Sequence, residues 1–181
     1  MDYRTHLFLP LSKQFVNLLV LKVFDNPGDF EIVYQLIFDT NEKVAWRAAW
    51  ACQKISEKHS EWFTNQHYTE LASLAISTTQ GGLKRGCLSI LNNLPIPIPI
   101  PVDLLNACFD WMLSSKSPIA VQALSLKILY NFCIVEPDLR IELLACLENI
   151  NIADYSPGFK STRNNILKAL NTKTFQLTVD N

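Results

Sequence analysis

Residues 43–55 read Lys-Val-Ala-Trp-Arg-Ala-Ala-Trp-Ala-Cys-Gln-Lys-Ile, a pattern typical of an amphipathic helix. Apolar residues of small and medium size recur at helical spacing: Val44, Ala48, Ala51 or Cys52, and Ile55. Basic and aromatic residues at positions 43, 47, 50 and 54 make a second stripe on another face. Because the alanines of the apolar stripe are small, a neighbouring helix can approach closely, as a layered helical array requires.

This segment returns three more times in altered form. Its anchor is the apolar residue near the helix end, which falls at Cys52, Leu91, Leu129 and Leu167, with separations of 39, 38 and 38 residues. Helix–turn–helix units of this period cannot bury their apolar faces singly, so they stack on one another. The repeat predicts an all-α fold: a short right-handed α-α superhelix of about four helix pairs.

Turn and proline signals divide the chain into three predicted parts. Residues 1–27 hold an N-terminal capping helix, which ends at Asp25-Asn-Pro-Gly28. Residues 28–170 hold the repeats, and 171–181 a loose tail. The predicted helix pairs are about 28–57, 58–94, 95–134 and 135–170. Asp29 is expected to cap a helix that runs through Phe38. Alternate prolines in Pro95-Ile-Pro-Ile-Pro-Ile-Pro101 predict an extended connector between two repeats.

Composition narrows the classes of function. The net charge is −1, so overall charge favours neither nucleic acid nor membrane, and the longest apolar run is too short to cross a bilayer. The five cysteines are odd in number, lack C-x-x-C spacing and sit in apolar patterns. We therefore expect a cytoplasmic protein with reduced thiols and no signal peptide. His59 and His67 have no ligand-spaced partners, so no metal ion and no cofactor are expected.

The period, the paired helices and the V-x-x-R-A-A pattern at 44–49 resemble HEAT repeats of the armadillo-type superhelix. More narrowly, several segments resemble a group of small bacterial HEAT-like proteins: Trp-Arg-Ala-Ala-Trp at 46–50, Gly-Leu-Lys-Arg at 82–85, Asn-Phe at 131–132, the stretch 137–143 and Gly-Phe-Lys-Ser at 158–161. The resemblance covers roughly residues 28–170. It implies a fold that serves many unrelated tasks, so it does not assign a function by itself.

Charges are segregated between the two helices of each pair. The first segments (28–41, 58–81, 95–114 and 135–157) hold 12 acidic and 2 basic residues, which gives −10. The second segments (42–57, 82–94, 115–134 and 158–170) hold 10 basic and 2 acidic residues, which gives +8. In HEAT-like solenoids the second helices line the concave face, so the resemblance implies a basic inner surface. Its expected members are Lys43, Arg47, Trp50, Lys54, Lys84, Arg85, Asn92, Asn93, Lys127, Asn131, Lys160, Arg163, Asn164 and Lys168.

Three interpretations of this basic surface are open. Acidic and basic helices could simply neutralise one another between layers. Alternatively, the surface binds an acidic protein or peptide, which makes the chain a non-enzymatic interaction scaffold. As a third alternative, it binds a nucleic-acid backbone. We favour the acidic protein partner among the binding functions.

Trp46 and Trp50 flanking Arg47 are similar to the clefts of HEAT-like DNA glycosylases, the enzymatic variant of the third alternative. Such an enzyme also needs a carboxylate in its cleft, and the second helices offer only Glu42 and Glu57. We therefore expect no catalytic residues. In the structural interpretation the tryptophans pack between helices, with Arg47 lying over Trp50.

Glycines at 81, 82 and 86 precede and open a predicted helix that also carries Lys84 and Arg85. Free N–H groups beside two cations are compatible with an anion site. The simpler interpretation is a tight turn followed by close contact between helices.

Overall fold

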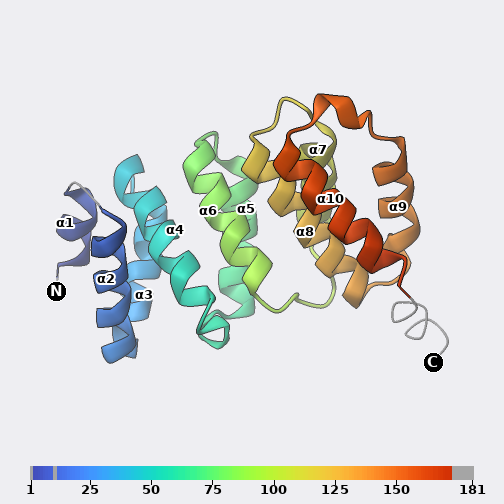
Figure 1. Ribbon diagram of the computed structural model, residues 1–181. Helices are drawn as coiled ribbons and strands as arrows, with labels where there is room; N and C mark the ends of the chain where they lie inside the picture. Colours follow the sequence, from blue (N-terminus) through green and yellow to red (C-terminus); the bar gives the residue numbers. More distant parts are fainter. Residues whose placement is uncertain (1, 10–11, 173–181) are drawn as a thin grey trace. The chain divides into compact units, whose positions relative to one another are not determined.

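The computed structural model describes residues 2–9 and 12–172, and within them the regular secondary structure is helical (Figure 1). These two ranges contain short 3₁₀ helices besides the α-helices, and they contain no strand. The all-α prediction is confirmed. The α-helices are α1 (Tyr3–Phe8), α2 (Lys13–Asp25), α3 (Phe30–Gln35), α4 (Glu42–Ser56), α5 (Asn65–Ser77), α6 (Gly81–Asn93), α7 (Val102–Leu113), α8 (Ile119–Val135), α9 (Leu139–Asn149) and α10 (Pro157–Leu170). The 3₁₀ helices are Pro27–Asp29, Leu36–Phe38, Ser60–Trp62 and Ile152–Asp154.

The chain forms two compact units, Met1–Pro95 and Ile96–Asn181. The first contains α1 to α6 and the second contains α7 to α10. The division falls at the alternating prolines, where residues 94–101 hold no helix, as predicted. The predicted repeat boundaries stay a prediction, although the boundary between the second and third pairs lies at the same proline.

Helix α4 is the centre of the first unit and packs against α1, α2, α3 and α6 (Figure 1). Its predicted apolar stripe is buried, since Val44, Ala48, Cys52 and Ile55 are inaccessible to solvent. Asn41 caps the helix by accepting hydrogen bonds from the first-turn N–H groups. Helix α5 packs against α6, which completes the second layer of this unit.

Helix α8 is the centre of the second unit, as α4 is of the first, and it packs against α7, α9 and α10. It buries Leu126, Ile128, Leu129 and Phe132, which come from two adjacent faces of one helix. A helix that is apolar on so much of its surface needs neighbours on more than one side. Three packed helices supply them.

Helix α1 is absent from the sequence-based prediction, which placed only one helix before residue 28. Asp2 caps it by accepting from the Thr5 N–H. The predicted cap by Asp29 is wrong: its side chain makes no cap hydrogen bond and instead accepts from the Tyr3 hydroxyl at 2.6 Å. The predicted helix 29–38 is broken into a short α3 and a 3₁₀ turn. Most of the predicted tail, residues 173–181, lies outside the described residues.

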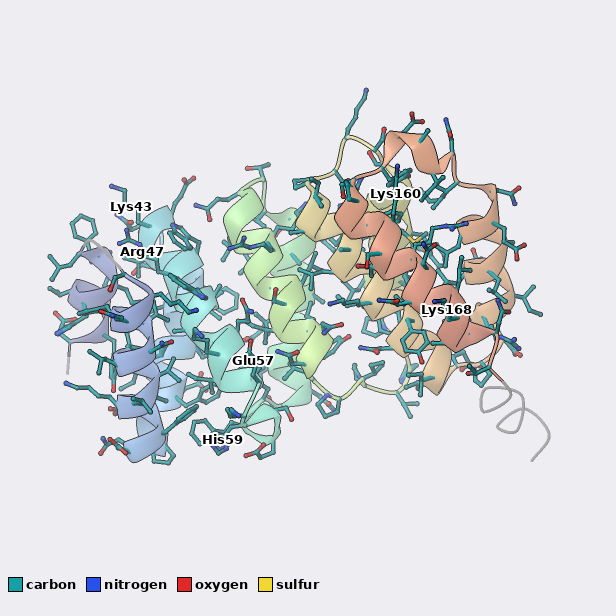
Figure 2. The ribbon with its side chains drawn as sticks, in the orientation of Figure 1. Lys43, Arg47, Glu57, His59, Lys160 and Lys168 are labelled. Atoms are coloured by element: carbon teal, nitrogen blue, oxygen red, sulfur yellow. The ribbon has the colours of Figure 1, made fainter. Side chains whose placement is uncertain are left out.

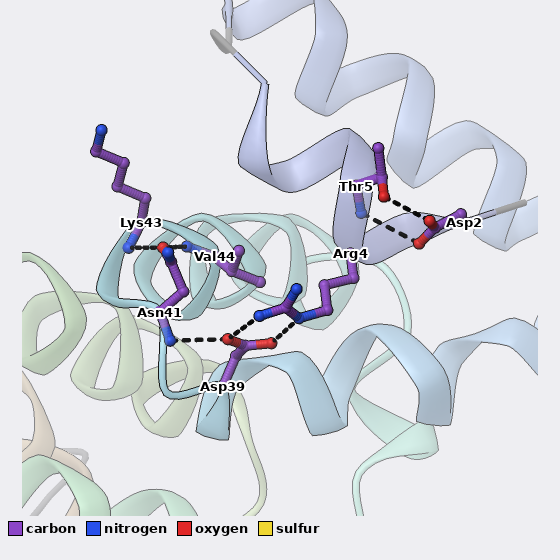
Figure 3. Close-up of polar contacts among 7 residues, drawn as sticks. All are labelled: Asp2, Arg4, Thr5, Asp39, Asn41, Lys43 and Val44. Carbon is purple, nitrogen blue, oxygen red and sulfur yellow. Dashed lines mark hydrogen bonds and ion pairs between the residues drawn. The ribbon is translucent and has the colours of Figure 1, made fainter.

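Helix α1 is held to the start of α4 by an ion pair (Figure 3). The Arg4 guanidinium donates to both carboxylate oxygens of Asp39, from Nε at 2.6 Å and from Nη2 at 3.1 Å. The same carboxylate accepts from the Asn41 N–H at 2.8 Å. Arg4 therefore supports the turn that precedes α4 as well as α1 itself.

Candidate basic interaction surfaces

The predicted basic residues fall into two groups, one in each compact unit. In the first unit they lie on α4 and α6, which pack side by side, and we call this group the first basic surface. In the second unit they lie on α8 and α10, which also pack side by side, and these form the second basic surface. The first basic surface comprises Lys43, Arg47, Trp50, Lys54, Lys84, Arg85 and Asn92. The second comprises Lys127, Asn131, Lys160, Arg163 and Lys168.

The side chains of the first basic surface differ in exposure. Lys43 and Arg85 are exposed, whereas Lys54 and Lys84 are half-buried. Burial lowers the pKa of Lys84 below its ordinary value, because the charged ammonium loses hydration. Figure 2 shows Lys43 and Arg47 near the start of α4 and Glu57 beyond its opposite end. Two of the basic side chains of α4 therefore lie in its N-terminal half, away from the Glu57 carboxylate.

Arg47 has an intramolecular role that the sequence did not reveal. Its Nη1 atom donates to the carbonyl oxygens of Leu7 at 2.8 Å, Phe8 at 3.2 Å and Leu9 at 2.7 Å. These carbonyls end α1, where no further helical turn supplies donors. Arg47 thus caps α1, and its guanidinium is already bonded to the main chain.

Arg163 makes the equivalent contact in the second unit. Its Nε and Nη2 atoms donate to the Leu147 carbonyl oxygen at 2.9 and 2.6 Å, near the end of α9. In both units, therefore, an arginine of a basic helix is bonded to the C-terminal turn of a neighbouring helix. A cation near a helix C-terminus also stabilises the helix macrodipole.

The two tryptophans of α4 stack on each other, with ring centroids 6.2 Å apart and an interplanar angle of 15°. The Arg47 guanidinium lies 5.5 Å from the ring centroid of Trp46. The guanidinium therefore lies over the tryptophan next to it in sequence, and the expected position of the Arg47 stem over Trp50 stays a prediction. A Cβ atom at Gly82 would lie 3.9 Å from Trp46, so this ring also contacts the start of α6.

Of the three glycines of α6, Gly86 allows a close approach to α4. A Cβ atom added at Gly86 would come within 2.7 Å of the Ala49 Cβ atom, whereas the space around Gly81 is open. The α6 N-terminus has no side-chain cap, and Gln80 donates instead to Glu42 of α4.

Six cations of the basic surfaces have no carboxylate partner among the described residues. Within residues 2–9 and 12–172, no carboxylate lies within 4.0 Å of the charged nitrogens of the six lysines and arginines listed next. They are Lys43, Lys54, Arg85, Lys127, Lys160 and Lys168. The described ion pairs join Arg4 to Asp39, His59 to Glu61 and His67 to Glu31.

The residues considered for catalysis or metal binding have other partners. Glu42 and Glu57 are exposed, and each accepts from a glutamine side chain. His67 accepts from the Thr64 N–H through Nδ1, and its Nε2 lies 3.3 Å from a Glu31 oxygen. In the part of the chain that the structure describes, no three His, Cys, Asp or Glu side chains are placed to hold a metal ion. Nor does any helix there have the length and apolarity to cross a bilayer.

A pocket in the second unit, between α7, α9 and the loop after α9, was not anticipated from the sequence. Its residues come from positions 113–155, and the only local signal is the polar loop Asn149-Ile-Asn151. Such a loop is typical of any helix end, so the approach of α7 to this segment could not be inferred.

Comparison with known proteins identifies one family. The family model described as HEAT repeat domain matches residues 3–170, which covers every described helix. The match begins within α1, earlier than the start of the resemblance expected at residue 28. No curated protein and no solved structure shows significant similarity to the chain.

Proposed function

The chain belongs to the HEAT repeat domain family, and we propose that it is a non-enzymatic interaction module that binds an acidic protein or peptide through its basic surfaces. HEAT repeats typically serve as scaffolds for protein interaction, which gives the proposal its class of partner. The family alone does not choose the partner's chemistry. That choice comes from the charges of the second helix in each pair.

The observation that carries the proposal is the lack of direct neutralisation described above. Segments 42–57 and 82–94 of the first unit hold five basic and two acidic residues. Segments 115–134 and 158–170 of the second unit hold five basic residues and no acidic ones. Cationic side chains that are not ion-paired within the protein keep their capacity for an external anion. An acidic segment would supply carboxylates to them.

We divide the candidates into those proposed to contact a partner and those already bonded to the main chain. Arg47 and Arg163 donate to main-chain carbonyls, so we assign them to holding the surfaces in place. We assign direct contact to Lys43, Lys54 and Arg85 in the first unit. In the second unit we assign it to Lys127, Lys160 and Lys168, of which the last two lie on α10 (Figure 2).

Nucleic acid is a less suitable ligand for the first basic surface. Sequence-tolerant binding of single strands uses aromatic rings on which bases stack. Here Trp46 is already in contact with Arg47, Trp50 and the start of α6. A glycosylase would in addition need a carboxylate held inside a cleft, whereas Glu42 and Glu57 are exposed. These observations favour a peptide chain of carboxylates.

The test is binding of a fluorescein-labelled peptide of twelve residues, alternating glutamate and glycine, followed by fluorescence anisotropy. The variant Lys54→Glu with Arg85→Glu reverses two charges on the first basic surface and leaves the cap at Arg47 intact. Its control is Lys13→Glu with Lys22→Glu, which makes the same charge change on exposed positions of α2. Circular dichroism verifies that both variants stay helical.

We expect the α4/α6 variant to bind about tenfold more weakly than wild type, because two attractive pairs become repulsive. The α2 control should bind within about twofold of wild type. Equal weakening in both variants would show that only net charge matters, and unchanged binding in both would overturn the assignment. The pair Lys127→Glu with Lys168→Glu applies the same test to the second basic surface.

The same assay with a DNA duplex separates the two classes of partner. A protein that neutralises about five phosphates loses affinity with a log–log salt slope of about −4 to −5. Tighter binding to DNA than to the acidic peptide at matched ionic strength, with that slope, would replace the proposed partner by nucleic acid. Base release from alkylated DNA would identify the glycosylase variant.

A further inference from the structure

The pocket of the second unit has a volume of about 520 Å³ and is open to solvent at one side. This lies within the range of cavities that bind small ligands or single side chains, roughly 300–1,000 Å³. All of its lining residues belong to one compact unit, and none of them lies on α8 or α10, which carry the second basic surface.

The walls of the pocket are fixed by hydrogen bonds. The Tyr155 hydroxyl donates to the Leu113 carbonyl oxygen at 2.6 Å, which ties the loop after α9 to the end of α7. The Tyr155 ring stacks on Phe159, with centroids 4.5 Å apart. On the loop itself, the Asn151 side chain donates to the Asp154 carboxylate at 3.0 Å. The loop after α9 is therefore held to the end of α7, to α10 and by a hydrogen bond within the loop.

The polar groups that line this pocket include one carboxylate and no cation. The pocket lies at the C-terminal ends of α7 and α9, where the Leu113 carbonyl accepts from Tyr155 and the Leu147 carbonyl accepts from Arg163. Asp154 adds a carboxylate, and Asn149 and Asn151 add side-chain amides. None of the residues that line it is a lysine, arginine or histidine. Asp154 is therefore the charged group among the residues that line the pocket.

We propose that this pocket binds the cationic side chain of an arginine or lysine on a partner peptide, with Asp154 as the charged acceptor. The side-chain oxygens of Asn149 and Asn151 supply neutral acceptors around it, and a guanidinium has enough donors to use several at once. The side chain would enter beside Cys146, whose methylene and the ring of Tyr155 provide apolar contact for its stem. The chain would then recognise cations here and anions on its basic surfaces.

The test is an NMR titration of the ¹⁵N-labelled protein with the peptide acetyl-Gly-Gly-Arg-Gly-Gly-amide. The same peptide with citrulline at the centre keeps the shape and removes the charge. We expect saturable shifts for Ser115, Asn149, Asn151 and Asp154 with the arginine peptide and no saturable shift with the citrulline peptide. Titration with agmatine, which carries the guanidinium without a peptide, shows whether the flanking backbone adds affinity.

Two variants locate the site. Asp154→Asn removes the charge and should weaken binding about tenfold, as loss of one charge-assisted hydrogen bond does. Ala145→Phe places a ring in the pocket from an exposed position of α9 and should abolish binding. Glu148→Gln, an exposed charge on the same helix that does not line the pocket, is the matched control and should bind as wild type.

Outcomes that contradict the proposal are equally distinct. Equal shifts with arginine and citrulline would show that charge is not recognised. Absence of saturable shifts up to about 20 mM peptide, roughly 2 kcal/mol of binding, would show that the pocket takes no such side chain. If Glu148→Gln weakened binding as much as Asp154→Asn does, the effect would come from the overall negative charge near α9 and not from Asp154 in particular. Weaker binding of the peptide than of agmatine would move the ligand from a peptide to a free cation.

Discussion

A Cβ atom added at Gly86 would lie 2.7 Å from the Cβ atom of Ala49. Both positions are buried, at the contact between α4 and α6. Of the three glycines of α6, Gly86 is the one whose added Cβ atom would come closest to α4. Because the Ala49 methyl is fixed to its backbone, it cannot rotate away as a long side chain could. The helices themselves would have to separate.

Gly86→Ala should therefore destabilise the protein, by about 1–3 kcal/mol, despite the higher helix propensity of alanine. The measurement is the free energy of unfolding by urea, with circular dichroism as the probe. Gly82→Ala is the control, because a Cβ atom there would meet nothing closer than 3.9 Å. It should leave stability unchanged or raise it slightly. An increase for Gly86→Ala would show that α4 and α6 are not in close contact.

The cap that Arg47 forms on α1 predicts a local effect as well as a global one. Arg47→Met keeps much of the side chain's length but removes every donor to the Leu7, Phe8 and Leu9 carbonyls. Hydrogen bonds to a charged group contribute about 1.5–3 kcal/mol, so unfolding free energy should fall by about that amount. Amide hydrogen exchange in residues 3–9 should accelerate more than exchange in α4.

Lys43→Met is the control for this change, since Lys43 is an exposed cation one turn earlier on the same helix. It should alter neither stability nor exchange in α1 beyond about 0.5 kcal/mol. If Arg47→Met left exchange in α1 unaffected, the three carbonyl contacts would contribute nothing to holding that helix.

The pair of Arg4 and Asp39 predicts a dependence of stability on pH. The Arg4 guanidinium, and then the Asn41 N–H, lower the pKa of the Asp39 carboxyl below its ordinary value of 3.8. A lowered pKa in the folded state means that the pair stabilises the protein above the ordinary pKa. The contribution is lost as pH falls through the folded value, in the region below about pH 4.

Arg4→Gln should therefore be less stable than wild type by a constant amount near neutral pH, and the difference should shrink below about pH 4. The measurement is the urea midpoint of both proteins across the acidic range. An NMR titration of Asp39 provides the direct check, because its pKa should rise in the variant. An unchanged pKa would mean that Arg4 does not hold the carboxylate in solution.

The cysteines predict a labelling pattern. Cys52, Cys87, Cys108 and Cys133 are buried, and Cys146 is partly accessible. Burial raises the pKa of Cys87, Cys108 and Cys133 to about 12 each, so they hold almost no thiolate at neutral pH. Burial, and secondarily Glu142, also raise the pKa of Cys146.

One thiol should therefore react with a disulfide reagent under native conditions, more slowly than free cysteine, and all five should react in denaturant. Peptide mapping should place the native label on Cys146, and Cys146→Ser should remove it. Rapid native labelling of two or more thiols would contradict the burial described for the cores of both units.

Helix α5 was predictable from the sequence because its signals are local. It runs over Asn65–Ser77, within the predicted pair 58–94, and the Thr64 side chain accepts from the N–H of His67 as a capping residue does. The stripe of α4 was predictable for the same reason, since spacing alone assigns Val44, Ala48 and Ile55 to the buried face. Capping and periodicity are properties of neighbouring residues, and they are visible without the fold.

Helix α1 and the role of Arg47 could not be inferred in that way. A helix of six residues has little stability of its own, so α1 depends on contacts with residues about 25 to 40 positions further along the chain, at Asp29, Asp39 and Arg47. The spacing of Arg47 placed it correctly beside other cations, but its bonding partner is a main chain that no periodicity reveals. The same holds for Arg163 and the end of α9.

The partners of Arg47 and Arg163 are carbonyl oxygens, which carry no net charge. Each guanidinium therefore keeps its full positive charge while it is held rigidly in place. An acidic partner approaching through solvent would experience the field of these two arginines before any contact forms, and would be accelerated toward the protein. Their contribution would thus appear in the association rate and its salt dependence, while the lysines determine how long the complex lasts.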